Sequence, residues 1–168
     1  MGKGINRMDN RRKIGLTVGG GLGLIGGIAL RCAAGSPLPV LRLIGADTLL
    51  PPLWLVGVLW LAGYALAGGA AGYLSACPVV GGRRAVLLWR GGTFLALSIG
   101  LSFCWYSCLF GSFHLLLSWV CLVTSVGFAL LCMLSWWRLN SICAIAIGVL
   151  TIWLLCLVLF QFVLLLRA

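Results

Sequence analysis

Long apolar runs without charge constrain the fold of this chain more than any other feature. No Asp, Glu, Lys or Arg occurs between Arg90 and Arg138. Of the 168 residues, 62% are hydrophobic and 8% are charged, and the mean hydropathy is +1.17. A soluble domain of this length could not bury so much apolar surface, so the bilayer must act as the solvent. The sequence therefore predicts an all-α integral membrane protein, a single bundle of five transmembrane helices.

The predicted spans alternate with segments that hold most of the basic residues and prolines. A basic cytoplasmic tail, residues 1–13, precedes a membrane domain of residues 14–168. Within that domain we expect spans at residues 14–30, 53–77, 93–110, 115–136 and 142–166. All five prolines lie outside these spans. This distribution supports the boundaries, because proline disrupts a helix interior.

The net charge of +10 arises from 12 Lys and Arg residues against 2 Asp and Glu residues. In a soluble protein such a charge would suggest a nucleic acid partner. Here the basic residues lie mainly in the tail and between the spans, so we interpret them as topology signals and contacts with membrane lipids. We expect no nucleic acid partner. The positive-inside rule predicts a cytoplasmic N-terminus and a C-terminus on the opposite side.

The residues that usually carry catalysis or bind metals are scarce. Most of the eight cysteines lie inside apolar runs, without a CxxC motif, and His114 is the only histidine. These cysteines are expected to behave as small buried hydrophobes, and no metal site is predicted. No paired carboxylates or activated nucleophile can be recognised, so the sequence assigns no catalytic residue and requires no cofactor.

The second span carries aromatic side chains with polar atoms on one flank. It reads PPLWLVGVLWLAGYALAGGAAGY, and Trp54, Trp60 and Tyr64 would lie within about one hundred degrees of one another around a helix. Aliphatic residues suffice for contact with lipid, so the stripe predicts one wall of a ligand pocket, with Pro51 and Pro52 at its entrance. The alternative, an aromatic belt at the membrane interface, fits Trp54 better than the two deeper residues.

This stretch resembles the second helix of the TspO/MBR family, the tryptophan-rich sensory proteins or translocator proteins (peripheral benzodiazepine receptor-like). The matching positions are Pro51, Pro52, Trp54, Gly57, Trp60, Tyr64 and Gly68. The remainder of the chain is similar in its architecture, five helices with a long first loop. Ser102, Trp105 and Phe110 match the family's third helix, with Ser in place of Asn. Trp153 and Gln161 match the fifth helix, where Val149 and Leu150 replace Pro-Tyr.

The resemblance implies a membrane receptor, sensor or carrier for a hydrophobic ligand. That ligand would be a porphyrin or another haem-pathway tetrapyrrole, with a sterol-like lipid as a second class. Light-dependent porphyrin degradation, which the family also implies, would be photochemistry of the ligand tuned by tryptophan. An indole face can stack on a large π-system while its N–H reaches one polar group. The ligand-binding residues assigned in this way are Trp60, Trp153, Tyr64, Trp105, Trp54, Pro51, Pro52, Gln161 and Ser102.

Three further features leave alternatives open. The segment 31–50 is interpreted either as a lid over the pocket, with Arg31 and Arg42 near porphyrin propionates, or as an ordinary external loop with both arginines at lipid headgroups. His114 is predicted to lie in a tight turn, which argues against an axial haem ligand. Small residues recur at four-residue spacing in the first span, at Gly15, Gly19, Gly23 and Gly27. Such a row would permit a close helix contact or a homodimer.

Two other functions compete with ligand binding. The first is transport of small solutes or drugs, but coupled transporters usually carry a carboxylate within the membrane, and Asp9 and Asp47 both lie outside the predicted spans. The second is an assembly or scaffold subunit that uses the glycine row of the first span to pack a partner helix.

Overall fold

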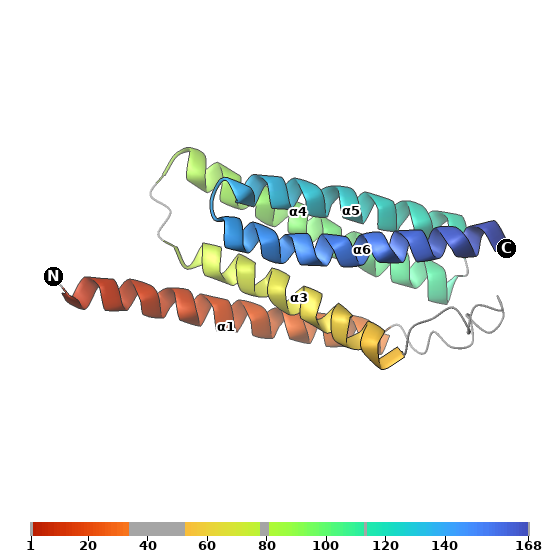
Figure 1. Cartoon of the computed structure of the whole chain (residues 1–168), viewed down its shortest axis with the longest axis horizontal. Helices are drawn as coiled ribbons and strands as arrows, with labels where there is room; N and C mark the ends of the chain where they lie inside the picture. Colours follow the sequence, from red (N-terminus) through yellow and green to blue (C-terminus); the bar gives the residue numbers. More distant parts are fainter. Residues whose placement is uncertain (1, 34–52, 78–80, 113, 168) are drawn as a thin grey trace.

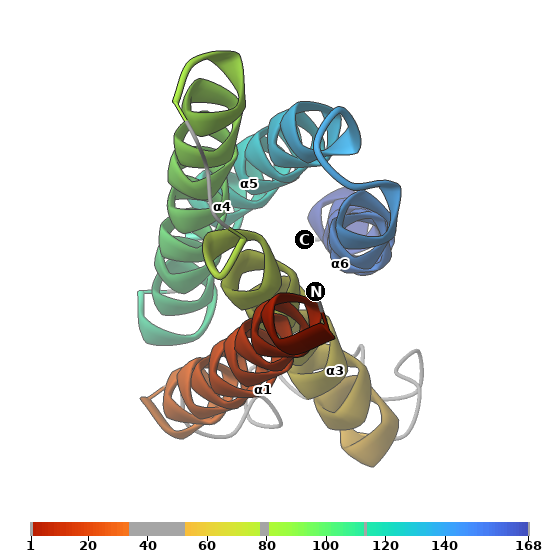
Figure 2. The same ribbon diagram turned by 90° about the vertical axis from the view of Figure 1, so that its left-hand side faces the viewer.

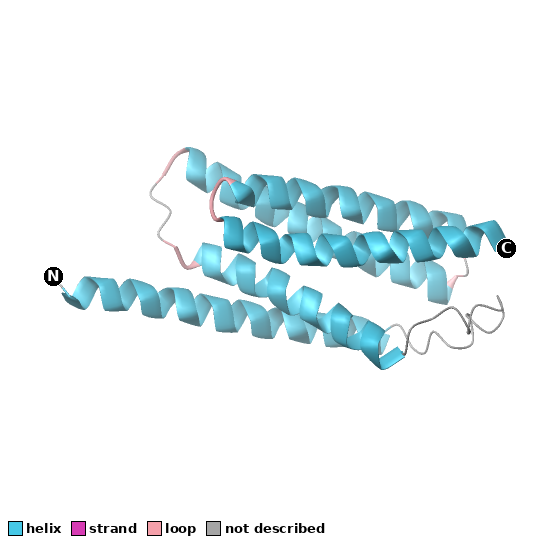
Figure 3. Cartoon of the chain, viewed as in Figure 1, coloured by secondary structure: helices cyan, strands magenta, loops and turns pink. Residues whose placement is uncertain are grey.

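The computed structural model describes residues 2–33, 53–77, 81–112 and 114–167. The described elements are α1 (Gly2–Ala33), α3 (Leu53–Ser75), α4 (Arg83–Tyr106), the short π-helix η2 (Ser107–Gly111), α5 (Leu115–Trp137) and α6 (Ser141–Arg167). Five of these helical segments are long and apolar enough to cross a membrane. Figures 1 and 3 show them as an elongated bundle, with helix as the only regular structure among the described residues. The predicted all-α bundle of five candidate spans is confirmed.

The helices follow one another around the bundle in an order that differs from their order in the chain. The extensive contacts are those of α1 with α3, α3 with α6, α6 with α5, and α5 with α4. The end-on view in Figure 2 shows α1 and α3 crossing each other on one side of the bundle, with α4, α5 and α6 on the other. By contrast, few residues of α3 contact α4. The pair α1 and α3 therefore faces α4 with little backbone contact between them.

Glycines bring α1 and α3 into direct backbone contact. A Cβ atom added at Gly19 would collide with the carbonyl oxygen of Gly68, and one added at Gly15 would collide with the carbonyl oxygen of Gly72. A Cβ at Gly23 would likewise collide with the carbonyl oxygen of Tyr64. Close approach of this kind is how small residues hold helices together in a bilayer, where burial of apolar surface adds little. The predicted glycine row thus packs against a helix of the same chain.

A single glycine also permits close packing between α4 and α5. A Cβ atom at Gly91 would overlap the indole ring of Trp136. The buried ring lies against Gly91 and directs its Nε1 toward the carbonyl oxygen of Leu88, 3.5 Å away. A large residue of α5 thereby fits into a notch on α4, which helps to fix the spacing of the two helices.

Several helix ends differ from the predicted boundaries. Helix α1 begins at Gly2, within the predicted tail, and α4 begins at Arg83 instead of residue 93. Hydropathy marks only the apolar centre of a helix, so it does not detect turns that extend beyond the hydrocarbon core. Gly81 and Gly82, with φ values of 52° and 74°, lie just before α4. At the start of α6, Asn140 Oδ1 accepts a hydrogen bond from the backbone N–H of Ile142 at 2.9 Å, a typical N-cap.

The outer surface of the bundle is apolar. Large hydrophobic side chains are strongly exposed in the isolated chain on the described helices, for example Leu22, Leu116, Ile142 and Leu166. Buried polar side chains are mostly serines at the contacts between helices. Apolar groups outside and hydrogen-bonded polar groups inside are what a helical bundle in a bilayer requires. The structure therefore supports a multi-pass integral membrane protein.

The glycine contact predicts a position-specific loss of stability. The substitution Gly19→Leu should lower the free energy of unfolding by about 3 kcal/mol, the upper end of the usual cost of overpacking, because the obstructing atoms belong to backbone. Thermal unfolding of the full chain in detergent measures the effect. Gly21→Leu is the matched control, because a Cβ at Gly21 would meet nothing within 4 Å. Equal stability of the two variants would contradict the contact.

Candidate functional site

A buried aromatic cluster joins α3 to α4, two helices that otherwise make few contacts. Trp60 and Tyr64 come from α3, Trp105 and Tyr106 from α4, and Phe110 from η2. The indole rings of Trp60 and Trp105 stack with centroids 5.6 Å apart and planes 27° apart. The ring centroid of Tyr64 lies 5.5 Å from that of Trp60, and that of Phe110 lies 4.4 Å from that of Tyr106. Contacts of this geometry add to the energy of burial.

The structure brings together three of the aromatic residues that the resemblance assigns to a ligand. Trp60, Tyr64 and Trp105 form the centre of the aromatic cluster. Trp153 lies on α6, half-buried against the core, and forms none of the ring pairs found among the described residues. The faces of Trp60 and Trp105 thus contact each other.

Gln161 connects α6 to two other helices at one end of this cluster. Its Oε1 accepts a hydrogen bond from Trp105 Nε1 at 2.5 Å, and its Nε2 donates to the carbonyl oxygen of Leu115 at 3.1 Å. The Nε2 group also contacts Ser118 Oγ. The side chain is almost completely buried. Because an amide in an apolar interior is costly without partners, these bonds hold α4, α5 and α6 in a defined arrangement.

A group of buried serines links α4 to α5 beside Tyr64. Ser98 Oγ donates to the carbonyl oxygen of Ser125 at 2.9 Å, and Ser125 Oγ donates to the carbonyl oxygen of Ser98 at 2.8 Å. Ser102 Oγ lies 3.0 Å from Ser125 Oγ. The hydroxyl group of Ser102 also lies near that of Tyr64. Ser102 was assigned from the sequence, whereas its partners were missed. The sequence feature that could have predicted this group is the spacing of Ser98 and Ser102, four residues apart within an apolar span.

Two of the assigned tryptophans have buried indole N–H groups without an acceptor. The Nε1 atoms of Trp60 and Trp153, and that of Trp119, are inaccessible and have no hydrogen-bond partner. A buried donor without a partner costs about 1–3 kcal/mol, and such a group in a folded protein requires an explanation.

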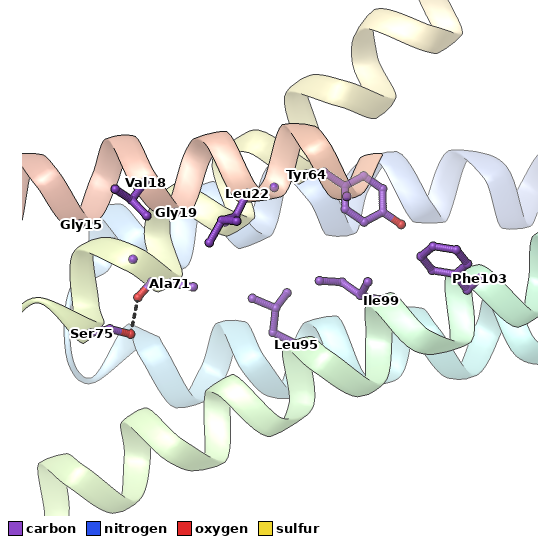
Figure 4. A pocket seen from close by; sticks show the side chains of 14 residues that line it. Gly15, Val18, Gly19, Leu22, Tyr64, Ala71, Ser75, Leu95, Ile99 and Phe103 are labelled. Atoms are coloured by element: carbon purple, nitrogen blue, oxygen red, sulfur yellow. Dashed lines mark hydrogen bonds between the residues drawn. The ribbon is translucent and has the colours of Figure 1, made fainter. Parts of the chain in front are cut away.

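An apolar cavity lies between the pair α1 and α3 and helix α4. Its volume is about 520 Å³. Figure 4 shows Leu95, Ile99 and Phe103 of α4 on one side of the space, with α1 and Tyr64 across from them. The opposite wall is rich in glycine, including Gly15, Gly19, Gly23, Gly26, Gly68 and Gly72. Of the predicted site residues, Tyr64 is the one that lines this cavity.

A second cavity of about 360 Å³ adjoins the first at Phe103. Its walls include Leu30 of α1 and Tyr106 and Phe110 of the aromatic cluster. Helix η2 lies here, where the backbone N–H of Ser112 donates to the carbonyl oxygen of Ser107 at 3.2 Å. Single π-helical turns are common at functional sites. The two cavities together run along α4 from the glycine contact to the aromatic cluster.

Some predicted features lie outside the described residues. These are Pro51, Pro52, Arg42 and most of the predicted lid, together with the side chains of Trp54 and Arg31. His114 is exposed and immediately precedes α5, in agreement with its predicted turn. In the part of the chain that the structure describes, no cluster of His, Cys, Asp or Glu could hold a metal ion.

The role of Gln161 is testable by substitution. Gln161→Leu should lower the free energy of unfolding by about 1–2 kcal/mol, because it leaves the buried N–H of Trp105 without an acceptor and removes the bonds from α6 to α5. Thermal unfolding in detergent provides the measurement. Thr151→Val on the same helix is the control, since this buried hydroxyl bonds only the carbonyl oxygen of Ile147, one turn earlier. If both variants lose the same stability, the interhelical role is wrong.

Comparisons with models of protein families, with curated proteins and with solved structures find no match for this chain. The likeness to the TspO/MBR family therefore rests on the sequence positions quoted above.

Proposed function

We propose that this protein is a membrane receptor or carrier that binds a flat hydrophobic ligand, of which a porphyrin is the favoured class. The observation that carries the proposal is the apolar cavity of about 520 Å³ between the α1 and α3 pair and α4. Its size falls within the range of small-molecule sites, about 300–1,000 Å³. Its lining is almost entirely apolar, with Tyr64 and Ser75 as the residues that bear hydroxyl groups.

The shape of the two walls favours a planar molecule. The wall formed by α1 and α3 is rich in glycine, and the side chains of Val18, Leu22 and Ala71 add apolar surface to it. The opposite wall carries Leu95, Ile99 and Phe103, which contribute broad apolar surfaces (Figure 4). A large ring system could lie between these walls with both faces in apolar contact. Such a ligand would be enclosed without any metal ligand from the protein.

Polar recognition would come from the aromatic cluster at the edge of the cavity. Tyr64 lines the cavity, and its side chain lies near that of Ser102. The ring of Trp60 packs against that of Tyr64 and supports its position at the cavity. A few placed donors in an otherwise apolar site typically fix the orientation of a ligand. A porphyrin or a related tetrapyrrole has both the ring and the acceptors, and the family resemblance supports the same class.

Two structural observations weigh against the competing functions. No acidic side chain lies within the described parts of the spans, whereas coupled transport usually needs a carboxylate in the membrane. The glycine row of α1 contacts α3 of the same chain. A scaffold subunit would need that row for a partner helix.

The proposal predicts that filling the cavity weakens porphyrin binding. Ile99→Trp should raise the dissociation constant for protoporphyrin at least tenfold, about 1.4 kcal/mol, because the new indole occupies the space of the ligand. Tyr64→Phe should raise it about fivefold, as expected for one lost hydrogen bond. Titration in detergent, followed by tryptophan quenching and porphyrin absorbance, measures both constants.

The matched control for the first variant is Leu97→Trp, which introduces the same ring on α4 at an exposed position. It should bind protoporphyrin as the native chain does. An unaltered titration for Ile99→Trp, or an equal loss for Leu97→Trp, would rule out this cavity as the site.

A further inference from the structure

A basic pocket lies at the end of the bundle where the N-terminal half of α1 meets the α5–α6 turn. In Figure 1 this is the end at which the N-terminus, the end of α3 and the start of α4 also gather. The pocket has a volume of about 220 Å³ and contains Arg12 and Arg84 together with Tyr73 and Asn140. It is distinct from the cavity beside the aromatic cluster and shares none of its lining residues.

The positive charge in this pocket has no counter-charge among the described side chains. The guanidinium carbon of Arg12 lies 5.8 Å from the centre of the Tyr73 ring, a cation–π arrangement. Its Nε atom is inaccessible and has no hydrogen-bond partner. The chain's two acidic residues, Asp9 and Asp47, both lie outside the described side chains. A partly buried arginine beside a second arginine favours an anion, and phosphate oxygens match the geometry of guanidinium.

An apolar groove continues from the basic pocket along the outside of the bundle. Tyr73 and Asn140 line both spaces. The groove has a volume of about 420 Å³ and is formed by α1, α3 and α6. Small residues such as Gly69, Ala70 and Ala146 make up much of its floor. A groove of this kind, at the depth of the membrane-spanning helices, fits an extended hydrocarbon chain.

We propose that the pocket and groove together form a binding site for one anionic phospholipid. The phosphate of the headgroup is held by Arg12 and Arg84, and an acyl chain occupies the groove between α1, α3 and α6. Basic pockets between membrane helices are a known form of anionic-lipid recognition on the cytoplasmic side. This end of the bundle is also the one that the positive-inside rule assigns to the cytoplasm. The lipid would link four helices at their ends.

Native mass spectrometry of the full chain in detergent tests the site. The probes are phosphatidylglycerol and phosphatidylcholine with identical acyl chains. The native chain should bind one phosphatidylglycerol about thirtyfold more tightly than phosphatidylcholine, given the usual gain per basic residue. The double variant Arg12→Gln and Arg84→Gln should lose this preference. The double variant Arg12→Lys and Arg84→Lys should keep most of it, which separates the effect of charge from that of folding.

Further variants test whether charge outside the pocket contributes to the preference and whether the groove binds the acyl chain. Arg83→Gln with Arg90→Gln removes two exposed charges outside the pocket and should leave the preference intact. Ala146→Phe should weaken binding of both lipids at least tenfold by filling the groove. Ile145→Phe, at an exposed neighbouring position, should not.

Three results would overturn the proposal. One is equal binding of the two lipids by the native chain. Another is an equal loss of preference in the Arg83 and Arg90 control, which would indicate diffuse surface charge. The third is binding of glycerol phosphate as tight as that of phosphatidylglycerol, with no effect of Ala146→Phe, which would indicate a water-soluble anion.

Discussion

The backbone contact between α1 and α3 is the interaction on which the rest of the structure depends. Gly15, Gly19 and Gly23 lie against Gly68, Gly72 and the backbone of Tyr64 without intervening side chains. In a bilayer, apolar burial contributes little to helix association, so close packing must hold α1 in place. The same glycines also line one side of the cavity, together with Val18 and Leu22. One sequence feature thus stabilises the helix pair and shapes the space beside it.

The other helices are joined by a different kind of interaction. Hydrogen bonds among Ser98, Ser102 and Ser125 connect α4 to α5, and the bonds of Gln161 connect α6 to both. The bundle therefore consists of a glycine-packed pair and a hydrogen-bonded group of three helices. Contacts of α3 with α6 and the aromatic cluster connect the two parts. The cavity lies at this junction, between the pair and α4.

Much of the fold could be predicted from the sequence, but less of the site could. The five spans and the glycine contact follow from hydropathy and from four-residue spacing, which are local properties. The meeting of Trp60, Tyr64 and Trp105 followed only from the family resemblance. The position of the cavity could not be predicted from the sequence. Periodicity indicates which face of a helix a residue occupies, but it does not indicate which other helix packs against that face. The helical turns at 2–13 were missed for another reason, since basic residues lower hydropathy without preventing a helix.

The central claim is that a planar apolar ligand lies between the glycine wall of α1 and α3 and the aliphatic wall of α4. Photolabelling of the full chain with a diazirine derivative of protoporphyrin, followed by peptide mass spectrometry, tests it most directly. We expect labels on Val18, Leu22, Ile99 and Phe103 that disappear when unlabelled protoporphyrin is in excess. Labels spread over the outer faces of α5 and α6, unaffected by that competition, would contradict the claim.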